Sequence, residues 1–301
     1  MTGSAEYAPI ALFAYARVDH LAATVDSLLT NVECEKTHLH VYCDGPRSVG
    51  HQPQIDQVRV YVDGIKGFAS VTRLYRDQNL GLARSIINGV NEILTQYETV
   101  IVMEDDLVVS PHFLKFMNEG LQLYRNEERV ASIHGYCYPV PEALPETFFL
   151  RGADCWGWAT WARAWRYFES NGQKLLNELE RKELIGAFDL DGAYSYSTML
   201  ANQVNGANDS WAVRWHAACF LRNMLTLYPG RSLVNNIGND GSGTHCATTN
   251  AYEQVVAVQP ISINILSAEE SVLGREAVKR YLKKQHSLSA RVLRRIRTLL
   301  K

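Results

Sequence analysis

Short apolar runs alternate with amphipathic stretches along the first part of the chain. Four of the runs have the length of a buried strand, namely residues 10–15, 39–43, 69–75 and 99–103. After each of the first three, apolar residues recur at intervals of three and four, the spacing of a helix with one buried face. These apolar positions are Leu21, Val25, Leu28 and Leu29, then Ile55, Val58, Val62 and Ile65, then Leu82, Ile86, Val90, Ile93 and Leu94. Strands that alternate with helices predict an α/β fold built on a mostly parallel sheet.

Two residues are candidates for helix starts. Asp19 can cap the helix after the first run, because a side-chain oxygen there accepts from a free backbone N–H. Pro111 suits the first turn of a helix after the fourth run, since it has no N–H to leave unpaired. From about residue 130 the pattern changes, because residues 130–134 predict a fifth strand and a tryptophan-rich segment follows. We expect a mixed α/β second half that forms the other wall of a crevice.

Polar residues stand directly after each predicted strand. They are Arg17, residues 44–45 (Asp-Gly), residues 76–79 (Arg-Asp-Gln-Asn) and residues 104–106 (Glu-Asp-Asp). Because ligands of open α/β sheets bind outside the carboxyl ends of the strands, these side chains should converge on one crevice. Cationic and anionic groups together predict a nucleotide and metal site. Ordinary polar loop residues are the alternative.

The acidic triplet Glu104, Asp105 and Asp106 carries the most specific chemistry. Adjacent carboxylates at the end of a buried strand are unfavourable unless a positive group lies among them. A divalent cation is such a group, and Mg²⁺ or Mn²⁺ is commonly held by one or two carboxylates together with substrate phosphates. The triplet therefore favours a substrate that carries a diphosphate.

Composition and charge exclude several classes of protein. With 301 residues, 47% of them hydrophobic, the chain can bury a full core, which excludes intrinsic disorder. The net charge of −2 hides an uneven distribution, because residues 275–301 hold ten Lys and Arg and one Glu. The rest of the chain carries 20 basic and 31 acidic residues, which argues against nucleic acid as a partner.

The six cysteines lie far apart, with no CxxC pair and no zinc-ligand spacing. Reduced, packed thiols are the expectation. The N-terminal segment has no basic region before an apolar stretch of signal-peptide length, and no run approaches the roughly 18 apolar residues of a membrane span. We expect a cytoplasmic protein.

At residues 100–117, the sequence VIVMEDDLVVSPHFLKFM resembles the metal-binding segment of GT-A glycosyltransferases. The likeness is greatest to the animal N-acetylglucosaminyltransferase I family, which acts on mannose-terminated N-glycans. Further blocks follow in matching order over about residues 9–246: FAYARVDHLAATVDSLL, VYCDGPR, FLRGADCWGWATWARAW, NDSWAVRW and YPGRSLVNNIGNDGSGTH. We expect a GT-A domain over residues 1–265, with a Rossmann-like nucleotide-sugar half that gives way to an acceptor half after about residue 130. A basic helical tail follows at residues 266–301.

The resemblance assigns donor-binding roles along the strand ends. It implies that Arg17 and Asp44 contact the uridine. It also implies that Asp105 meets the ribose or the donor sugar, beside Glu104, and that Asp106 ligates Mn²⁺ or Mg²⁺. The carboxylate of Asp44 can accept from the uracil imide N–H, a donor that cytosine lacks. A plain turn is the alternative for Asp44.

Residues 79–84 (NLGLAR) are similar to an NxGxxxAR pattern of GT-A enzymes, with one residue fewer before the arginine. The resemblance places Asn79 and Arg84 near the diphosphate. For Arg84, the alternative is a surface salt bridge.

The segment CWGWATW at residues 155–161 permits two interpretations. Aromatic rings stack on the apolar faces of sugars, so Trp156 and Gly157 are assigned to the donor sugar, with Asp154 as a partner of its hydroxyls. The matching segment of the family has an acidic residue and a Gly-Trp pair in the same order. The later tryptophans recur at helical spacing and are assigned to a helix core. These are Trp158, Trp161 and Trp165.

Inversion at the anomeric carbon needs a base that takes the proton of the acceptor hydroxyl. Asp209 is the candidate, since the family's catalytic aspartate lies in a similar setting before a tryptophan; there two acidic residues are adjacent, whereas here the second is Ser210. Asp209 can instead cap the helix that follows, and Asp154 is then the second candidate for the base. His245 follows a glycine-bearing loop and is either a metal ligand or an ordinary loop residue.

The combined expectation is a metal-dependent, inverting glycosyltransferase. It would move N-acetylglucosamine or a related hexose from a UDP-sugar to a saccharide or lipid-linked saccharide, in bacterial surface-glycan synthesis. A sugar-nucleotide nucleotidyltransferase is one alternative, although the position after the first strand lacks the glycine-rich phosphate loop of those enzymes. A non-catalytic carbohydrate-binding protein is another, although it leaves the acidic triplet unexplained.

The end of the chain has apolar residues at helical spacing with Arg and Lys between them. This predicts a basic amphipathic helix, which can lie on the inner face of a membrane. Packing on the acidic body, or pairing between two copies of the chain, is the alternative. The apolar positions are Leu288, Val292, Leu293, Ile296, Leu299 and Leu300, and the basic ones are Arg291, Arg294, Arg295, Arg297 and Lys301.

Overall fold

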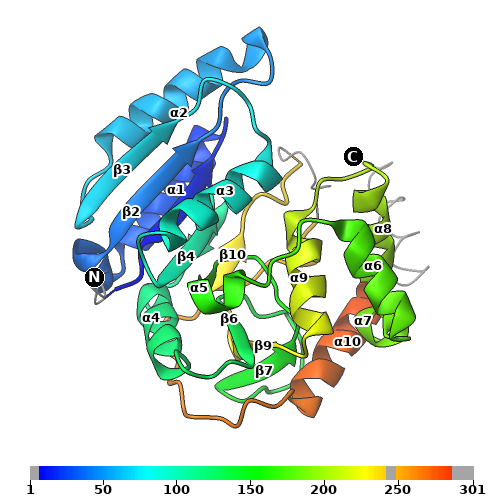
Figure 1. Ribbon diagram of the computed structural model, residues 1–301. Coiled ribbons are helices and arrows are strands. Elements are labelled where there is room, and N and C mark those ends of the chain that lie inside the picture. Colours follow the sequence, from blue (N-terminus) through cyan, green and yellow to red (C-terminus); the bar gives the residue numbers. More distant parts are fainter. Residues whose placement is uncertain (1–6, 242–248, 287–301) are drawn as a thin grey trace, which may run out of the picture.

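The computed structural model describes residues 7–241 and 249–286, which Figure 1 shows as a coloured ribbon. Its main sheet has eight strands. These are β1 (Ile10–Ala14), β2 (His38–Cys43), β3 (Ser70–Tyr75), β4 (Thr99–Glu104), β6 (Val130–His134), β7 (Thr147–Arg151), β8 (Trp158–Trp161) and β9 (Leu225–Pro229). Their order across the sheet is β3-β2-β1-β4-β8-β6-β9-β7.

The strands β3, β2, β1 and β4 are parallel and form the half of the sheet that the sequence pattern predicts. All of β1 is buried, as its uninterrupted apolar run requires. The connecting helices are α1 (Val18–Leu29), α2 (Gln52–Gly64) and α3 (Leu82–Leu94), and short 3₁₀ turns stand at η1 (Val32–Lys36) and η2 (Val49–His51). Helix α3 packs on β1 and β4, whereas α1 packs against α2. The predicted α/β class with a mostly parallel central sheet is confirmed.

The second half of the sheet mixes strand directions. β8 runs antiparallel to β4 and to β6, while β9 is parallel to β6 and antiparallel to β7. A two-stranded sheet pairs β5 (Leu107–Val109) with β10 (Val234–Asn236). The remaining helices are α4 (Phe113–Leu123), α5 (Ala162–Trp165), α6 (Gly172–Arg181), α7 (Ile185–Phe188), α8 (Tyr196–Val204), α9 (Trp211–Leu221) and α10 (Val272–His286). A parallel half followed by a mixed half is the two-part arrangement expected of the GT-A class.

Both predicted helix starts differ from the structure. Helix α1 begins at Val18 with Arg17 at its N-cap position, so Asp19 lies in the first turn and does not cap it. A carboxylate there still faces the positive end of the helix dipole. Helix α4 begins at Phe113, which leaves Pro111 ahead of the helix.

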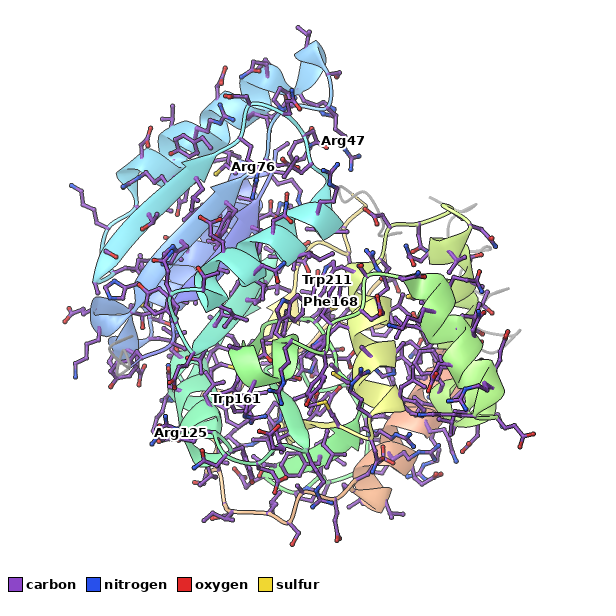
Figure 2. The ribbon with its side chains drawn as sticks, viewed as in Figure 1. Arg47, Arg76, Arg125, Trp161, Phe168 and Trp211 are labelled. Carbon is purple, nitrogen blue, oxygen red and sulfur yellow. The ribbon has the colours of Figure 1, made fainter. Side chains whose placement is uncertain are left out.

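The tryptophans assigned to a helix core lie partly in a strand. Trp158 and Trp161 are the two ends of β8, and Trp165 is helical. Their burial is confirmed, since all three are almost completely buried. Trp158 stacks on Trp211, with ring centroids 5.4 Å apart, while the indole N–H of Trp161 donates to the carbonyl of Leu121 in α4. Trp161 and Trp211 are labelled in Figure 2. A strand that is covered on both faces has apolar residues on both of them. The three-residue interval between Trp158 and Trp161 therefore could not distinguish a buried strand from a helix.

Helix α10 packs directly on β7. A Cβ atom added to Gly274 would lie 2.5 Å from the ring of Phe148, which shows how closely the helix approaches the strand. Val278 and Leu282 are buried in the same apolar cluster as Phe148. The predicted amphipathic segment at residues 287–301 lies outside the described residues, and the division of the chain at residue 265 stays a prediction.

The described cysteines are free thiols, as expected. They are Cys34, Cys43, Cys137, Cys155 and Cys219, and Cys246 lies outside the described residues. Within residues 7–241 and 249–286, none of the helices combines the length and the apolar character that crossing a membrane requires.

Candidate functional site

The end of β1 meets the acidic triplet at one edge of the sheet. Phe13 of β1 pairs in register with Glu104, the last residue of β4. The chain after β1 therefore runs beside the triplet. The guanidinium of Arg17 donates to Asp105 Oδ1 and, at 2.8 Å, to Asp106 Oδ2. Residues that the sequence pattern placed at one crevice are thus in direct contact.

Arg17 supplies a positive charge among the carboxylates. Burial alone would lower its pKa, but the nearby carboxylates of Asp105 and Asp106 outweigh burial and raise it, so the guanidinium stays charged. The resemblance implied that Arg17 contacts uridine. In the structure its hydrogen bonds go to the two aspartates, which it holds in a fixed orientation.

One guanidinium does not balance the whole triplet. Burial, together with the charges of Asp106 and Asp105, raises the pKa of Glu104 far above the usual range of a carboxyl group. Burial also raises the pKa of Asp105 to about 6, although Arg17 opposes it. A second cation at this place would relieve the remaining repulsion.

Asp106 fits the role of a metal ligand. Its Oδ1 is buried and has no hydrogen-bond partner among the described residues, whereas its Oδ2 accepts from Arg17. The chain after β10 passes close by, because a Cβ atom on Gly238 would lie 2.0 Å from Asp106 Oδ2. A hard carboxylate oxygen without a partner suits Mg²⁺ or Mn²⁺.

The described residues do not show a complete set of protein ligands for a metal. Within residues 7–241 and 249–286, no three His, Cys, Asp or Glu side chains are arranged to enclose one. The other predicted ligand, His245, lies outside the described residues.

Asp44 fixes the loop that leads into α3. Its carboxylate accepts from the backbone N–H groups of Leu80, at 2.9 Å, and Gly81, at 2.9 Å. Asn79 donates from its amide to the carbonyl of Gly45 at 2.8 Å. A Cβ atom on Gly45 would lie 2.6 Å from the backbone of the same loop, so only glycine fits there. Asp44 and Asn79 therefore shape the loop at the strand ends, and the contact of Asp44 with uracil stays a prediction.

Several arginines surround this loop. Arg84 is exposed on the first turns of α3 and forms no ion pair with another described residue, so the structure gives no support to a surface salt bridge. Arg47 and Arg76 follow β2 and β3 (Figure 2). The Nε atom of Arg76 is buried without a partner in the described part of the chain. These side chains leave cationic groups available near the strand ends.

A cavity of about 340 Å³ lies in the second half of the molecule. Its walls come from the segments after β6 and β7, from α8, α9 and α10, and from the chain after β10. Aromatic side chains dominate the lining, namely Tyr136, Tyr138, Trp156, Tyr194, Tyr196 and Tyr252. A second hollow of similar volume lies on the surface of α6, where one helix lines it with mostly polar side chains and no ring. The aromatic cavity is therefore the candidate for binding a sugar.

Asp154 lines the aromatic cavity and is held by two tyrosines. Its Oδ2 accepts from the hydroxyls of Tyr138 at 3.0 Å and Tyr228 at 2.8 Å. Burial, with the charge of Asp154 as a further cause, raises the pKa of both tyrosines, so they keep their protons and donate. Asp154 Oδ1 has no hydrogen-bond partner in the described part of the chain, and it can accept from a ligand.

Two histidines in the cavity wall are neutral. Burial lowers the pKa of His134 to about 4 and also lowers the pKa of His216, although Asp154 opposes both effects. His134 Nε2 accepts from the backbone N–H of Trp156 at 3.1 Å. Gly152 has a φ of 95°, and a Cβ atom there would lie 2.4 Å from the ring of His216. Glycine at 152 is thus required by both conformation and space.

Trp156 lies in the cavity wall, and Gly157 lies behind it. The ring of Trp156 makes edge-to-face contacts with Tyr136, at 4.8 Å between centroids, and with Tyr252, at 5.7 Å. Gly157 has a φ of 62°, and a Cβ atom there would lie 2.9 Å from Val234. Gly157 therefore lets the chain pass close to β10, and its assignment to the donor sugar stays a prediction.

Cys155 is a cavity residue that also lies near the acidic triplet. It lines the cavity with its neighbours Asp154 and Trp156. Burial, and then the charges of Glu104, Asp154 and Asp106, raise the pKa of its thiol. Because such charge effects weaken with distance, Glu104 and Asp106 lie near Cys155 and so near the wall of the cavity.

Asp209 lies at the surface beside the cavity. Its side chain is 62% exposed and accepts from Arg214 at 3.3 Å. Ser210 caps α9, since its hydroxyl accepts from the N–H of Val213 at 3.2 Å. The capping alternative for Asp209 is therefore wrong. Ser210 lines the cavity, so Asp209 is one residue away from the wall.

The tyrosines around Asp154 were missed in the sequence. Two Tyr-x-Tyr pairs line the cavity: 136/138 on the irregular segment after β6, and 194/196 at the start of α8. This repeated spacing was visible in the sequence. It could not show that both pairs line one cavity with Asp154, because the two segments come together only in the folded chain.

Comparisons with known proteins give partial likenesses. No protein-family model matches the chain, and no curated protein matches it. One similar solved structure is the mannosyltransferase PcManGT from Pyrobaculum calidifontis in complex with GDP-Man and Mn²⁺, at 15% identity and a TM-score of 0.33 over 44% of this chain. Another is TarS from S. aureus, at 14% identity and a TM-score of 0.31 over 49% of this chain. The matches span 36% and 24% of those two chains, well under half of either.

Proposed function

We propose that this protein is a metal-dependent glycosyltransferase of the GT-A type, which moves a sugar from a UDP-sugar to a saccharide hydroxyl. One observation supports the proposal most. The triplet, in which Asp106 Oδ1 has no partner among the described residues, lies near Cys155, which lines an aromatic cavity together with Asp154. A place for a metal-bound diphosphate beside a sugar-sized aromatic cavity is what such a transfer requires.

On the donor side, Asp106 would bind Mn²⁺ or Mg²⁺, which stabilises negative charge on the leaving diphosphate. Asp105 and Glu104 stand beside it at the ribose and the donor sugar. Arg17 keeps the two aspartates in place through its two hydrogen bonds. These roles give the buried triplet a function, although burying its carboxyl groups is unfavourable and raises the pKa of Glu104.

The loop before α3 would receive the rest of the nucleotide. Asp44 and Asn79 fix this loop, and Arg84 offers an exposed cation to the diphosphate near the N-terminus of the helix. Trp156 and Gly157 would border the donor sugar, where the cavity wall meets the triplet.

For the base, the geometry favours Asp154 over Asp209. Asp154 lines the cavity and has one carboxylate oxygen without a partner among the described residues, whereas the carboxylate of Asp209 is exposed to solvent and bound to Arg214. A base must lie within hydrogen-bond reach of the hydroxyl that it deprotonates. Asp154→Asn should therefore lower kcat by about two orders of magnitude or more, and Asp209→Asn by far less. The reverse order would move the role back to Asp209.

The decisive experiment incubates the protein with Mn²⁺, a panel of UDP-sugars and mixed saccharide acceptors, and measures release of UDP. UDP release that depends on an acceptor supports the proposal. Pyrophosphate release from UTP and a sugar phosphate would identify a nucleotidyltransferase instead. Metal-dependent UDP binding without turnover on any pair would favour a carbohydrate-binding protein. A lipid-linked acceptor of a bacterial surface glycan belongs in the panel, because residues 287–301 are rich in basic and apolar residues.

A further inference from the structure

The described lining of the aromatic cavity holds one negatively charged side chain and no Lys or Arg. Among the described residues that line it, Asp154 is the single carboxylate, and none is Lys or Arg. Burial lowers the pKa of His134 and of His216, so neither histidine supplies a cation near neutral pH. Burial also raises the pKa of Tyr196, so its hydroxyl stays protonated.

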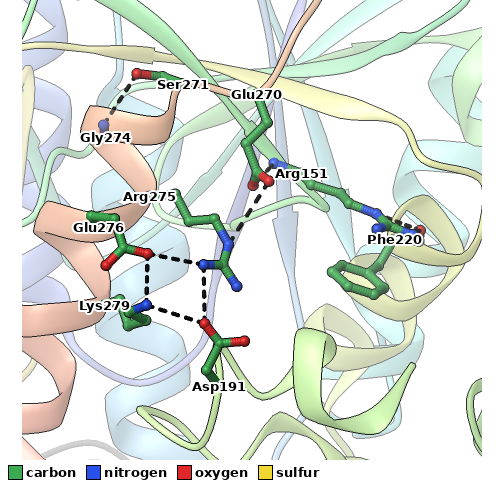
Figure 3. A network of polar contacts seen from close by, with 9 residues as sticks. All are labelled: Arg151, Asp191, Phe220, Glu270, Ser271, Gly274, Arg275, Glu276 and Lys279. Atoms are coloured by element: carbon green, nitrogen blue, oxygen red, sulfur yellow. Dashed lines mark hydrogen bonds and ion pairs between the residues drawn. The ribbon is translucent and has the colours of Figure 1, made fainter. Parts of the chain in front are cut away.

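The positively charged side chain of Arg151, on the neighbouring strand β7, binds Phe220. Arg151, in β7, donates from Nε and Nη2 to the carbonyl of Phe220, at 3.1 and 2.9 Å. Its guanidinium also lies 3.9 Å from the centre of the Phe220 ring, and Figure 3 shows it turned toward that residue. Arg151 therefore does not neutralise Asp154 from within the cavity.

Asp154 is the charge that a ligand in the cavity meets directly, because it lines the wall itself. An anionic group there would lose its hydration without gaining a cationic partner, which is strongly unfavourable.

The size and lining of the cavity suit a single sugar ring. A volume of about 340 Å³ is near the lower end of the range for small-molecule sites. Aromatic rings line it, Tyr194 and Tyr252 among them, and such rings pack on the C–H faces of a pyranose. Asp154 Oδ1 and the hydroxyls of Ser210 and Tyr194 offer hydrogen bonds for its hydroxyl groups.

We propose that this cavity is the acceptor subsite for an uncharged pyranose, and that Asp154 excludes sugars carrying a carboxylate or a phosphate. The term acceptor rests on the proposed function. Binding of the neutral sugar and exclusion of the acidic one depend only on the cavity itself.

The first test compares matched pairs of sugars that differ by one charge. Binding of methyl glucoside, galactoside and mannoside is measured against the corresponding methyl uronides by saturation-transfer NMR, with UDP and Mg²⁺ present. At least one hexoside should bind about ten-fold or more tightly than its uronide, as expected for like charges brought together. Equal binding within every pair, or no binding of any hexoside, overturns the proposal.

The second test changes the charge of the cavity without removing Asp154. Met199 lines the cavity from α8, and Met199→Lys introduces a cation on a side chain of similar length, with Met199→Gln as the uncharged control. The lysine variant should bind uronides at least as tightly as hexosides, while the glutamine variant keeps the wild-type preference. Unchanged preference in the lysine variant contradicts the proposal.

Asp154→Asn gives an independent check, because it removes the charge and nearly keeps the shape. The difference between each hexoside and its uronide should shrink several-fold, and Asp56→Asn, an exposed acid on α2, should leave it unchanged. Should Asp154→Asn fail to fold, the Met199→Lys and Met199→Gln variants still test the proposal.

Sugar binding with this preference but no transfer from any UDP-sugar would refute the proposed function alone. Transfer to uronides and hexosides at equal rates would refute the subsite proposal alone.

Discussion

At the scale of single residues, Arg17 and Asp106 decide how the triplet can work. Arg17 neutralises part of the buried charge and occupies one oxygen of Asp106, which leaves Oδ1 for another partner. Removing one member of a buried ion pair commonly costs about 3–5 kcal/mol, because the other charge stays buried and unpaired. Arg17 is therefore expected to matter for folding as well as for the donor.

The first prediction concerns Asp106. Asp106→Ala should abolish the Mn²⁺-dependent part of UDP binding and lower turnover by about two orders of magnitude or more, because the leaving diphosphate loses its metal. Asp106→Asn should be nearly as damaging, since the neutral amide is a weaker ligand. UDP affinity is measured by calorimetry with Mn²⁺ and with EDTA. Asp26→Asn, at an exposed site on α1, is the control and should behave as wild type. A Mn²⁺ effect of wild-type size in Asp106→Ala would show that the triplet holds no metal.

The second prediction concerns the pH dependence of stability. The pKa of His134 falls from its usual value near 6.5 to about 4 in the folded chain, so the unfolded chain binds a proton more readily below pH 6.5. The stability that neutral His134 contributes is present above pH 6.5 and is lost as the pH falls toward 4, by at most about 3 kcal/mol. Urea unfolding at pH 7.5, 6 and 5 measures this loss.

His134→Gln is the matched variant, because its amide oxygen can still accept from Trp156. Its stability should fall less steeply between pH 6.5 and 5 than that of the wild type. Asp105 acts in the opposite direction, since its pKa is raised to about 6, but it is the same in both proteins and cancels in the difference. Parallel pH profiles would mean that His134 is not kept neutral by burial.

At the scale of elements, α10 is tied by charge to the loop before α8. Asp191 Oδ2 accepts from Arg275 at 3.2 Å and from Lys279 at 3.1 Å, a network drawn in Figure 3. Asp191 has a φ of 55° and Gly192 a φ of 80°, so the chain turns sharply before it reaches Tyr194 in the cavity wall. Helix α10 thereby helps to fix one wall of the cavity.

The third prediction removes that charge and keeps the turn. Asp191→Asn should leave the backbone conformation intact, because asparagine tolerates a positive φ. The melting temperature should change little, but the KM for the acceptor should rise roughly two- to five-fold while the KM for the donor stays the same. Steady-state kinetics with each substrate varied in turn measure the two constants.

Glu178→Gln is the control for this variant. Glu178 on α6 also accepts from two cations, Arg181 at 2.8 Å and Lys182 at 3.1 Å, but it does not line the aromatic cavity. An equal rise of acceptor KM in both variants would point to a general effect of surface charge. No rise in Asp191→Asn would show that α10 does not position the cavity wall.

At the scale of the whole molecule, the basic residues gather at the end of an otherwise acidic chain. The fourth prediction is that the full chain sediments with anionic liposomes at low salt and that deletion of residues 287–301 abolishes this. Each basic residue near an anionic surface contributes about 1 kcal/mol, and salt screens the attraction. Activity on a short soluble acceptor should survive the deletion.

Neutral liposomes are the control, since the amphipathic segment should bind them much less. Sedimentation that does not depend on lipid charge, or none at all with anionic liposomes, would refute the membrane contact. Unfolding of the deletion variant would instead assign residues 287–301 to the packing of the body, the alternative that the sequence left open.

The parallel half of the fold could be predicted from the sequence because its information is local. A buried strand needs a short apolar run, and the helix that covers it needs apolar residues at one face, so β1 to β4 and α1 to α3 can be read from neighbouring residues. The position of Glu104, Asp105 and Asp106 at the end of β4 follows from the same pattern. The spacing of apolar residues gave the wrong element where both faces of a strand are covered, as for Trp158 and Trp161 of β8.

The cavity depends on contacts between segments that are far apart in the chain. Asp154 lies between Tyr138 and Tyr228 only because β7 and β9 pair antiparallel and the segment after β6 lies next to them. Arg17 meets Asp105 because β1 and β4 are neighbours in the sheet, although two other strands and three α-helices lie between β1 and β4 in the sequence. No spacing along the chain encodes these encounters, since they arise from the register of paired strands. The sequence by itself determined the strand–helix order and the acidic strand end, while the tertiary structure decided which charge each carboxylate faces.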